Sequence, residues 1–449
     1  MSVNRTFYVS FLKGSDTNTG TAPEQAWKTI EKVNDQIFQP GDRVLFACGE
    51  KWHGMLSPRG DGAEFSPVLI GTFGDGEKPV IAGDGAYAAV YLKGVSHYRV
   101  NGLSVTNHSD ERGIRQGICI MGKPEGITED IIVENCEISD VTGENRRAMG
   151  PYRAMYWNGG IYVSFPGRTS EKNHLHGIVI SNNYIHDVLT SGIRVNQMED
   201  GLSDIHHTHV VVRKNRIERT GSDGIIVANC ISPLIDRNTC LYAGALGTKE
   251  DTNVIAGVWV CATENALIQH NEVAYTALFE NDGTAFDTDW GTSRDTVFQY
   301  NYTHDNGGGF FLDCMGIGGR NPECGKTILR YNVSLNDSRC LVQYDFGFPC
   351  EIYGNLFLNR SEAPGICEQG EGESHVFREN YFVFPKMPDR KWQASSFTGN
   401  FYSIALTPPA GDEKASRVIP EVILRVMETG EMTEKILSGI FRVISLRVN

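Results

Sequence analysis

The segments Ile268-Gln269-His270-Asn271 and Phe298-Gln299-Tyr300-Asn301 decide the fold, because they are two copies of one short phrase. Each copy is a β-type run that ends in asparagine. The phrase recurs at intervals that range from 23 residues (Asn215 to Asn238) to 48 residues (Asn135 to Asn183). The later copies end at Asn332, Asn355 and Asn380. Repetition at such a period indicates a solenoid, in which the shortest interval is one bare coil and the longer ones carry loop insertions.

A second phrase, a glycine followed by a short alternating strand, lies between the asparagine phrases. Its copies are Gly160-Ile161-Tyr162-Val163, Gly192-Ile193-Arg194-Val195, Gly224-Ile225-Ile226-Val227 and Gly257-Val258-Trp259-Val260. Two short strands per coil of roughly 23 residues, without stripes of period 3.6, predict a parallel β-solenoid. The recurrent asparagine predicts a ladder at a bend, where each side-chain amide bonds backbone groups of adjoining coils.

The N-terminal stretch carries a further signature, formed by Phe7-Tyr8-Val9-Ser10, Trp27-Lys28-Thr29-Ile30 and Pro40-Gly41-Asp42-Arg43. With these segments the chain resembles the pectin-lyase-like family of right-handed parallel β-helix proteins, over about residues 6 to 405. The resemblance implies an all-β fold, a single right-handed parallel β-helix over residues 1–408. It also implies that an edge strand and a short helix within residues 22–38 cover the first coil.

Two terminal segments are expected to be helical. Residues 24–36 fit the N-terminal cap helix, because Trp27, Ile30 and Val33 are spaced by three residues. Residues 409–449 lack the asparagine phrase and have an amphipathic, charged pattern that is interrupted at Gly430. We expect this segment to cover the terminal coil, because an open sheet edge invites aggregation. A helix for dimer formation and a poorly ordered tail are the alternatives.

Charge and hydropathy exclude two classes of partner. Lys and Arg total 41 against 55 Asp and Glu, which gives a net charge of -14. An acidic surface repels polyphosphate, so nucleic acid is not an expected partner. The longest apolar runs, such as residues 254–262, are far too short for a membrane span. The family resemblance implies a secreted or periplasmic protein, although the first five residues contain no signal segment.

Strand alternation places three aspartates on the outside of two neighbouring coils. If Phe286 points inward, then Asp287 and Asp289 point outward. In the next coil, which begins at Gly309, the same rule places Phe311 and Asp313 outward. Asp313 follows Asp289 by 24 residues, so we expect these two carboxylates to stack about 4.8 Å apart.

Stacked carboxyls suit the hydrolysis of a glycosidic bond. Like charges at this spacing repel, so one carboxyl is expected to hold its proton to a higher pH than the other. Glycoside hydrolysis uses one carboxyl as the acid and a second as the nucleophile or base. We therefore predict a glycoside hydrolase whose catalytic pair is Asp289 and Asp313, with Asp287 as the competing member. It is expected to act on a polysaccharide or oligosaccharide without a cofactor.

Two other functions stay open. The same carboxylates would also suit Ca²⁺, which collects oxygen ligands. Calcium would indicate a polysaccharide lyase acting on a uronic acid, but that reaction needs a base, and the outward positions offer only Arg194. The third possibility is a carbohydrate-binding solenoid without catalytic activity.

Further side chains are predicted to bind the substrate. Aromatic rings stack on the C–H faces of sugars, Arg194 would hold an acidic substituent, and Glu280 and Asp282 would extend the acidic cluster. His304 is a weaker candidate, because it follows Asn301 at the same offset at which His186 follows Asn183, as a plain repeat position would. The aromatic candidates are Trp259, Trp290 and Phe311.

Overall fold

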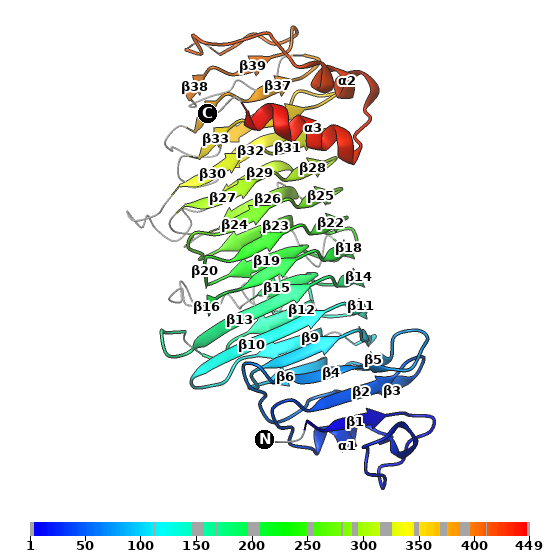
Figure 1. Ribbon diagram of the computed structural model, residues 1–449. Coiled ribbons are helices and arrows are strands. Elements are labelled where there is room, and N and C mark those ends of the chain that lie inside the picture. The colour runs from blue at the N-terminus through cyan, green and yellow to red at the C-terminus, as the bar shows by residue number, and fades with distance from the viewer. Residues whose placement is uncertain are drawn as a thin grey trace. The chain divides into compact units, whose positions relative to one another are not determined.

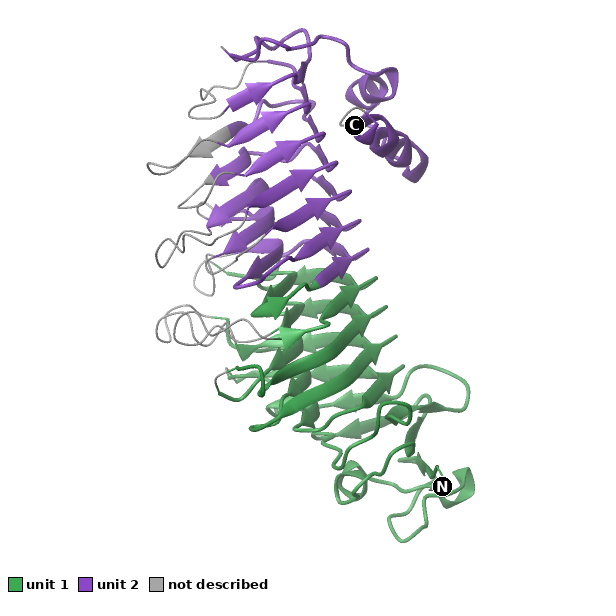
Figure 2. Ribbon diagram, turned by 60° about the vertical axis from the view of Figure 1, so that its left-hand side comes forward, with its two compact units in different colours: residues 1–233, 245–252 green, residues 234–244, 253–449 purple. Residues whose placement is uncertain are grey.

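Most coils of the chain contribute one strand to each of three parallel sheets, as the computed structural model shows (Figure 1). In these coils a strand of sheet 1 is followed by one of sheet 2 and then one of sheet 3, whereas the first and last coils have no strand in sheet 3 among the described residues. The structure describes residues 4–111, 113–145, 157–167, 169–195, 207–248, 255–279, 282–289, 295–314, 326–344, 350–368, 375–386, 396–409 and 411–446. The chain divides into two compact units, unit 1 (residues 1–233 and 245–252) and unit 2 (residues 234–244 and 253–449), which Figure 2 shows in green and purple.

Unit 1 contains the first coils of all three sheets. Its sheet 1 runs in the order β1 (Thr6–Val9), β2 (Arg43–Ala47), β4 (Val68–Phe73), β7 (Tyr98–Asn101), β10 (Ile127–Glu134), β13 (His174–Ser181) and β17 (Val211–Arg213), with β16 (His207–Thr208) between β13 and β20 (Cys230–Ile231). Its sheet 2 runs β3 (Lys51–His53), β5 (Val80–Ala82), β8 (Ser104–Asn107), β11 (Glu137–Val141), β14 (Tyr184–Val188) and β18 (Arg216–Thr220). Its sheet 3 runs β6 (Ala88–Lys93), β9 (Gln116–Met121), β12 (Gly159–Ser164), β15 (Ile193–Val195) and β19 (Ile225–Ala228).

Unit 2 repeats the same three-sheet arrangement. Its sheet 1 runs β21 (Leu234–Asp236), β24 (Leu267–Gln269), β27 (Thr296–Gln299), β30 (Thr327–Arg330), β33 (Glu351–Tyr353), β36 (Val376–Arg378) and β38 (Ser396–Thr398). Its sheet 2 runs β22 (Thr239–Leu241), β25 (Glu272–Ala274), β28 (Tyr302–His304), β31 (Val333–Leu335), β34 (Leu356–Leu358), β37 (Tyr381–Val383) and β39 (Phe401–Tyr402). Its sheet 3 runs β23 (Ala256–Cys261), β26 (Thr284–Asp289), β29 (Gly309–Cys314), β32 (Cys340–Tyr344) and β35 (Gly365–Glu368).

The two sequence phrases correspond to defined parts of a coil, so the predicted parallel β-helix is confirmed. The asparagine phrase is the end of a sheet 1 strand, and the glycine phrase is the start of a sheet 3 strand. The glycines are required by close packing inside the coil. A Cβ on Gly257 would lie 2.2 Å from Cγ1 of Val273, and a Cβ on Gly192 would lie 2.6 Å from Cγ2 of Ile217. Both contacted side chains come from sheet 2, so these glycines let sheet 3 approach it closely.

The predicted asparagine ladder joins successive coils of unit 2. The backbone N–H of each ladder asparagine donates to Oδ1 of the next one, as from Asn271 to Asn301 at 2.9 Å and from Asn301 to Asn332 at 3.0 Å. The side-chain amide of Asn301 also donates to the carbonyl of Ile268 in the preceding coil. Asn301 thus has hydrogen bonds to both the preceding and the following coil, and so it ties three coils together. The asparagines of the ladder are buried. The ladder runs through Asn238, Asn271, Asn301, Asn332, Asn355, Asn380 and Asn400.

An aspartate ends this ladder. Asp412 accepts the backbone N–H of Asn400 at 3.2 Å and its side-chain amide at 3.0 Å. It also accepts the backbone N–H of Gly399 and the hydroxyl of Tyr402. A carboxylate only accepts hydrogen bonds. It therefore suits the last position of the ladder, where the side chain of Asp412 accepts from Gly399, Asn400 and Tyr402.

One copy of the phrase departs from the ladder. In unit 1 the N–H of Cys136, and not that of Asn135, donates to Oδ1 of Asn183. Asn135 is exposed and has a φ of 55°. The phrase of this coil is therefore shifted by one residue, and Asn135 occupies the left-handed position of the turn, which asparagine tolerates.

The N-terminal helix is shorter than expected. Residues 24–36 contain only a 3₁₀ turn, η1 (Pro23–Gln25), and the helix α1 (Ile30–Asn34). Trp27, expected inside the helix, is extended instead, because its N–H donates to the carbonyl of Tyr8 and its carbonyl accepts from Ser10, both at 2.8 Å. These bonds attach it to the strand of the first coil, and α1 can begin only after Thr29, whose hydroxyl caps it.

Two helices follow the last coil, α2 (Glu421–Thr429) and α3 (Glu434–Ser445), and they are separated at Gly430, as the sequence predicted. We expected this segment to cover the open end of the last coil. The first part of the segment does pair with that coil, because Asp412 accepts from Asn400 and Ser416 forms a parallel bridge with Phe401. The two helices do not cover this end: Ile423, Val426, Ile440 and Ile444 pack on the outside of sheet 2. The sheet residues in this cluster are Val333, Leu335, Leu356, Leu358, Tyr381 and Val383.

The outward positions of sheet 2 explain this packing. In the earlier coils of unit 2 they include polar side chains such as Glu272 and His304, whereas in β31, β34 and β37 they are all large and apolar. The helices remove this apolar surface from water. None of the helices in the described part of the chain has the length and apolar character needed to span a membrane.

Candidate active site

The outer face of sheet 3 in unit 2 carries the two aspartates of β26. In the register of this sheet Asp287 lies opposite Trp259 of β23, and Asp289 lies opposite Cys261. On the other side, Asp289 lies opposite Cys314 of β29. Because side chains alternate along a strand, Asp287 and Asp289 project from the same face. The predicted outward direction of these two aspartates therefore agrees with the register.

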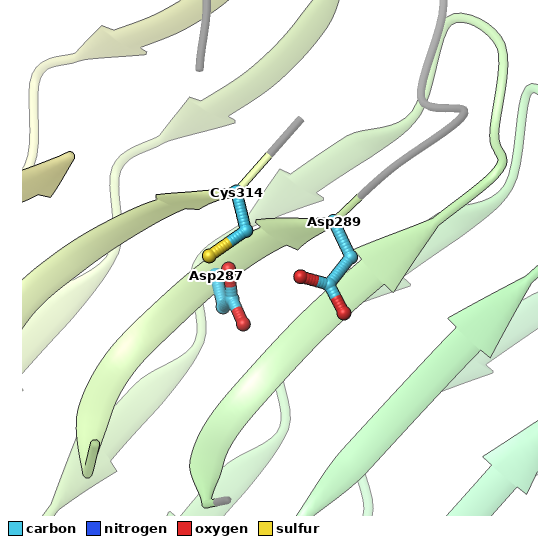
Figure 3. A group of neighbouring side chains, drawn as sticks. All are labelled: Asp287, Asp289 and Cys314. Atoms are coloured by element: carbon cyan, nitrogen blue, oxygen red, sulfur yellow. The ribbon is translucent and has the colours of Figure 1, made fainter. Parts of the chain in front are cut away.

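Three side chains gather at the end of this face. One oxygen of Asp287, one oxygen of Asp289 and the sulfur of Cys314 all lie within 4.8 Å of one another (Figure 3). Asp287 and Cys314 are each 7% exposed, and Asp289 is partly exposed. Two carboxyls and one thiol thus share a small site at which Asp289 is the member most open to solvent.

Asp313 does not belong to this group, contrary to our expectation. It lies opposite Thr288 in the register, and both side chains are completely buried. Inside the coil, Oδ2 of Asp313 lies 3.4 Å from Sγ of Cys350. The predicted stack of Asp289 on Asp313 is therefore wrong, because Cys314 occupies the position opposite Asp289.

The error has its origin in three consecutive glycines. The expected stack places Phe310, the residue after Gly309, opposite Phe286, 24 residues earlier. In the structure Phe311 lies opposite Phe286, and Gly308 matches Gly283, since its N–H donates to the carbonyl of Gly283 at 2.9 Å. The repeat is therefore 25 residues long here. A shift of one residue moves every side chain of a strand to the opposite face. The same shift explains Phe311, which was expected outside but is completely buried against Phe298.

Asp313 lies among other buried polar groups. The backbone N–H of Cys350 donates to Nδ1 of His375 at 3.1 Å. Burial lowers the pKa of His375 to about 4. Burial, with the nearby Asp313 carboxylate, raises the pKa of the Cys350 thiol well above its usual range. Both groups are therefore neutral near pH 7. They act as buried polar side chains that pack inside the coil.

His304 lies on a different sheet from the aspartates. It belongs to β28 of sheet 2, where Nδ1 contacts Asp305 at 2.9 Å and Nε2 contacts Glu272 at 3.3 Å. His186 in unit 1 has the equivalent contacts with Asp187 and Glu137. The repeat position is therefore the better description of His304, and the structure does not bring it to the carboxyl pair.

The other residues that were predicted to bind the substrate lie in different parts of the structure. Arg194 belongs to unit 1, where it is completely buried and its guanidinium lies 3.8 Å from the carboxylate of Asp223. Asp282 precedes β26 and accepts the backbone N–H groups of Ile255 and Gly283. Glu280 and Trp290 lie outside the described residues. Trp259 alone among the predicted aromatic residues is placed beside Asp287, and it is 6% exposed.

The sequence reasoning missed Cys314. Counting the coil from Gly308 would have aligned Cys314 with Asp289, but nothing in the run of three glycines marks which of them begins the repeat. The thiol also changes the metal chemistry of the group. Calcium prefers hard oxygen ligands, whereas a thiolate suits softer metals, so this donor set fits Ca²⁺ poorly.

Comparison with known proteins supports the fold and indicates a class of relatives. No family model matches the chain. The chain is 25% identical over 476 aligned positions to a lacto-N-biosidase of Bifidobacterium longum subsp. longum, an alignment that covers 85% of this chain but 29% of that protein. A stretch of 68 residues is 37% identical to alpha-1,3-galactosidase A of Akkermansia muciniphila and covers 11% of it. The chain therefore spans less than a third of the length of either curated relative.

Two solved structures have a similar fold. The GH136 lacto-N-biosidase of Eubacterium ramulus matches with a TM-score of 0.70 and 24% identity, over 85% of this chain and 67% of that one. A complex of XylC with xylose matches with a TM-score of 0.52 and 12% identity, over 93% of this chain and 87% of that one. The chain is thus similar in fold to these two proteins, and similar in sequence over most of its length to a lacto-N-biosidase.

Proposed function

We propose that the chain carries a glycoside hydrolase site on the outer face of sheet 3 in unit 2, with Asp287 and Asp289 as its two carboxyls. The observation that carries the proposal is the approach of these carboxyls to within 4.8 Å at neighbouring outward positions of one strand. The sequence similarity to a lacto-N-biosidase over 85% of the chain supports the same class of reaction.

The short separation favours hydrolysis with retention of configuration. Retaining enzymes place their two carboxyl groups about 5 to 5.5 Å apart, whereas inverting enzymes keep about 6.5 to 9.5 Å to admit a water molecule. Asp313 lies inside the coil, so it cannot form with Asp287 a more widely spaced pair of the kind that inversion would need.

The difference in exposure between the two carboxyls would decide which one is the acid and which one is the nucleophile. Burial favours the neutral form of a carboxyl, so Asp287 is the better acid and the more exposed Asp289 is the better nucleophile. Asp287 would give its proton to the glycosidic oxygen as that bond breaks, while Asp289 forms an ester with the anomeric carbon. Asp287 would then take a proton from the water molecule that hydrolyses the ester.

The substrate class follows from the relatives. We propose an oligosaccharide with a lacto-N-biosyl group at its end, because the relative with the longest alignment is named for this activity. Trp259 would contact the sugar at the site, since it lies one strand away from Asp287, about 4.8 Å.

The test is a chromogenic assay with p-nitrophenyl lacto-N-bioside, and p-nitrophenyl α-galactoside as the comparison substrate. Asp287→Asn and Asp289→Asn should each lower kcat by at least about a thousandfold, which is the scale of a lost catalytic group. Asp295→Asn, an exposed aspartate of the same unit, is the matched control and should keep its activity. Unchanged activity in both site variants would exclude this carboxyl pair.

A calcium-dependent lyase would behave differently in the same experiment. It would produce an unsaturated uronate with ultraviolet absorbance from an acidic polysaccharide, and EDTA would abolish that product. We expect reducing ends without this absorbance, because a site that includes the thiol of Cys314 suits Ca²⁺ poorly.

A further inference from the structure

The outer face of sheet 3 in unit 1 carries an aromatic patch at β6, the first strand of this sheet along the chain (Figure 1). Along β6, Val90 and Leu92 are completely buried, whereas Tyr91 is partly exposed and Lys93 is exposed. Side chains alternate along a strand, so Tyr91 and Lys93 project from the outer face. These residues are separate from the proposed active site, so what this face binds is independent of the proposed function.

The patch has a buried floor. In the register of the sheet Tyr91 lies opposite Cys119 of β9, and Cys119 lies opposite Tyr162 of β12. Ala88, Cys119 and Tyr162 pack together and are at most 2% exposed, and Tyr91 and Met121 pack against them. The floor therefore consists of one small side chain, one thiol and one aromatic ring, all of them removed from water.

Tyr87, which precedes β6, contacts this floor through its hydroxyl group. The hydroxyl donates a hydrogen bond to the thiol of Cys119, which is completely buried, and burial raises the pKa of Tyr87. The ring centroids of Tyr87 and Tyr91 lie 5.3 Å apart, with the ring planes inclined by 60°. Tyr87 is nevertheless 38% exposed. Because the hydroxyl is directed inward, this exposed surface belongs mainly to the aromatic ring.

This arrangement is the reverse of the usual one for a surface tyrosine. Such a side chain normally buries its apolar ring and keeps its hydroxyl in water. Here the hydroxyl is bonded to a thiol and the ring is exposed. A ring held in this way offers a fixed apolar surface, which suits the C–H groups of a sugar. Nζ of Lys93 lies 5.9 Å from the centre of the Tyr91 ring and adds a hydrogen-bond donor for a sugar hydroxyl.

The size of the patch fits a sugar ring better than a protein partner. A stable protein interface buries about 800 Å² on each side. A completely buried aromatic side chain contributes only about 150 to 250 Å², and Tyr91 is itself partly buried. None of the strand residues of sheet 3 in unit 1, all of which the structure describes, is an exposed large apolar residue. The exposed apolar surface is therefore confined to the rings of Tyr87 and Tyr91 and their immediate neighbour Met121.

We propose that the outer face of sheet 3 in unit 1 binds one pyranose ring, which stacks on Tyr87 and accepts a hydrogen bond from Lys93. The ligand is a sugar with a continuous C–H face, such as galactose, whose axial O4 leaves H3, H4 and H5 together on one side. The hydrogen bond to Cys119 keeps the Tyr87 hydroxyl inward and the ring open to this face. The site gives the protein a point of attachment to a glycan in a unit that contains neither member of the proposed catalytic pair.

The test is saturation-transfer NMR on the full chain, in which the aromatic protons of the protein are saturated. Methyl β-D-galactopyranoside is the probe, and galactitol is the matched comparison, because it carries similar hydroxyl groups without a ring face. We expect the strongest transfer to H3, H4 and H5 of the galactoside, and at least about threefold weaker binding of galactitol, the scale of one aromatic contact. Equal binding of the two probes, or uniform transfer to all galactoside protons, would overturn the proposal.

Variants then assign the binding to Tyr87. Tyr87→Leu should weaken the galactoside by about threefold to tenfold, whereas Tyr87→Phe keeps the ring and should stay within about twofold of the wild type. Tyr242→Leu is the control and should bind as the wild type does, because Tyr242 is 41% exposed and lies in unit 2. An unchanged affinity in Tyr87→Leu, or an equal loss in Tyr87→Phe, would overturn the ring contact. The pattern of transfer in the wild type keeps the test decisive if Tyr87→Leu fails to fold.

A second pair of variants separates this site from the proposed active site. Trp259→Leu and Asp289→Asn should keep the binding, because both residues belong to the other unit. Binding that is lost in these two variants and kept in Tyr87→Leu would overturn the inference. Self-association in sedimentation that Tyr87→Leu abolishes, without any bound galactoside, would make the patch a protein interface and overturn it equally. Conversely, an inactive enzyme that still binds the sugar at Tyr87 would contradict the proposed function and leave this inference standing.

Discussion

Thr288 of β26 and Asp313 of β29 are register partners that both point into the interior of unit 2. This relationship separates Asp313 from Asp287 and Asp289, which project from the opposite face of the same sheet. Aspartates that look equivalent in the sequence therefore have different surroundings: Asp313 is packed inside a coil, whereas Asp287 and Asp289 lie on the outer face of the sheet.

Replacing Asp313 should affect stability more than catalysis. Asp313→Ala removes a buried carboxylate that contacts Sγ of Cys350 at 3.4 Å, and we expect it to lower the free energy of unfolding by about 1 to 3 kcal/mol. The kcat of the folded fraction should stay within a few-fold of the wild type. Urea unfolding and active-site titration together measure both effects. An undiminished stability with a thousandfold loss of kcat would instead return Asp313 to the catalytic pair.

Trp259 should contribute to substrate binding. Trp259→Leu removes the aromatic face opposite Asp287, and we expect KM to rise by roughly tenfold with a smaller change in kcat, since ring contacts are worth about 0.5 to 1.5 kcal/mol. Trp52→Leu is the matched control, because Trp52 is equally buried but lies in unit 1 with its Nε1 bonded to the carbonyl of Lys28. It should lower stability without raising KM. A loss of kcat alone in Trp259→Leu would contradict the assigned role.

The asparagine ladder predicts opposite preferences at its middle and at its end. Asn301→Asp should destabilise unit 2 by about 2 kcal/mol, because the side-chain amide of Asn301 donates to Ile268 and Asn332. Asp412→Asn should also destabilise, since it would turn an amide toward the N–H groups that Asp412 now accepts.

Denaturant unfolding measures both ladder variants. Asn135→Asp serves as the control, because Asn135 is exposed and outside the ladder, and its midpoint should hardly change. If Asn301→Asp were as stable as the wild type, the ladder would not be what holds the coils together.

Protonation of His304 should make the stability of the protein depend on pH. Burial lowers its pKa, but the hydrogen bonds with Glu272 and Asp305 outweigh this effect, and the pKa is raised. The folded state therefore binds a proton more tightly than the unfolded state does. The resulting stabilisation is fully present below the unfolded pKa of about 6.5 and is lost as the pH rises through the folded pKa.

The measurement is the melting temperature between pH 5 and pH 9 for the wild type and for His304→Gln. The wild type should lose more stability across this range than the variant does. Parallel curves would show that the imidazole does not titrate differently on folding.

The C-terminal helices should protect the outer face of sheet 2. Ile440 is completely buried against β31, β34 and β37, and Ile440→Asp would place a charge in that apolar contact. We expect a loss of about 3 kcal/mol or more from the docking of α2 and α3, with faster amide exchange in the three strands beneath. Leu446→Asp is the control, because Leu446 is 74% exposed. Slow exchange in Ile440→Asp would mean that the helices do not protect these strands.

The sequence by itself determined the kind of fold and the fact that the two aspartates of β26 share one face, because both follow from local periodicity. A strand alternates with period two, so Asp287 and Asp289 share a face wherever the strand lies. The repeated asparagine and glycine phrases likewise predict stacked coils, since each phrase has one structural role per turn. The break at Gly430 was also readable, because glycine readily adopts the left-handed conformation that ends a helix.

Only the tertiary structure decided which residues meet across coils. The neighbour of Asp289 depends on whether the coil begins at Gly308 or Gly309, and local sequence allows both, because any of three glycines can begin a strand. Hydrogen bonding to Gly283 selects Gly308, and the choice exchanges Asp313 for Cys314 at the surface. In the same way, the extended conformation of Trp27 is imposed by Tyr8 and Ser10, and the position of α3 by apolar residues of three separate coils. Period and composition act within one segment, whereas register and docking are settled by the free energy of contacts between segments far apart in the chain.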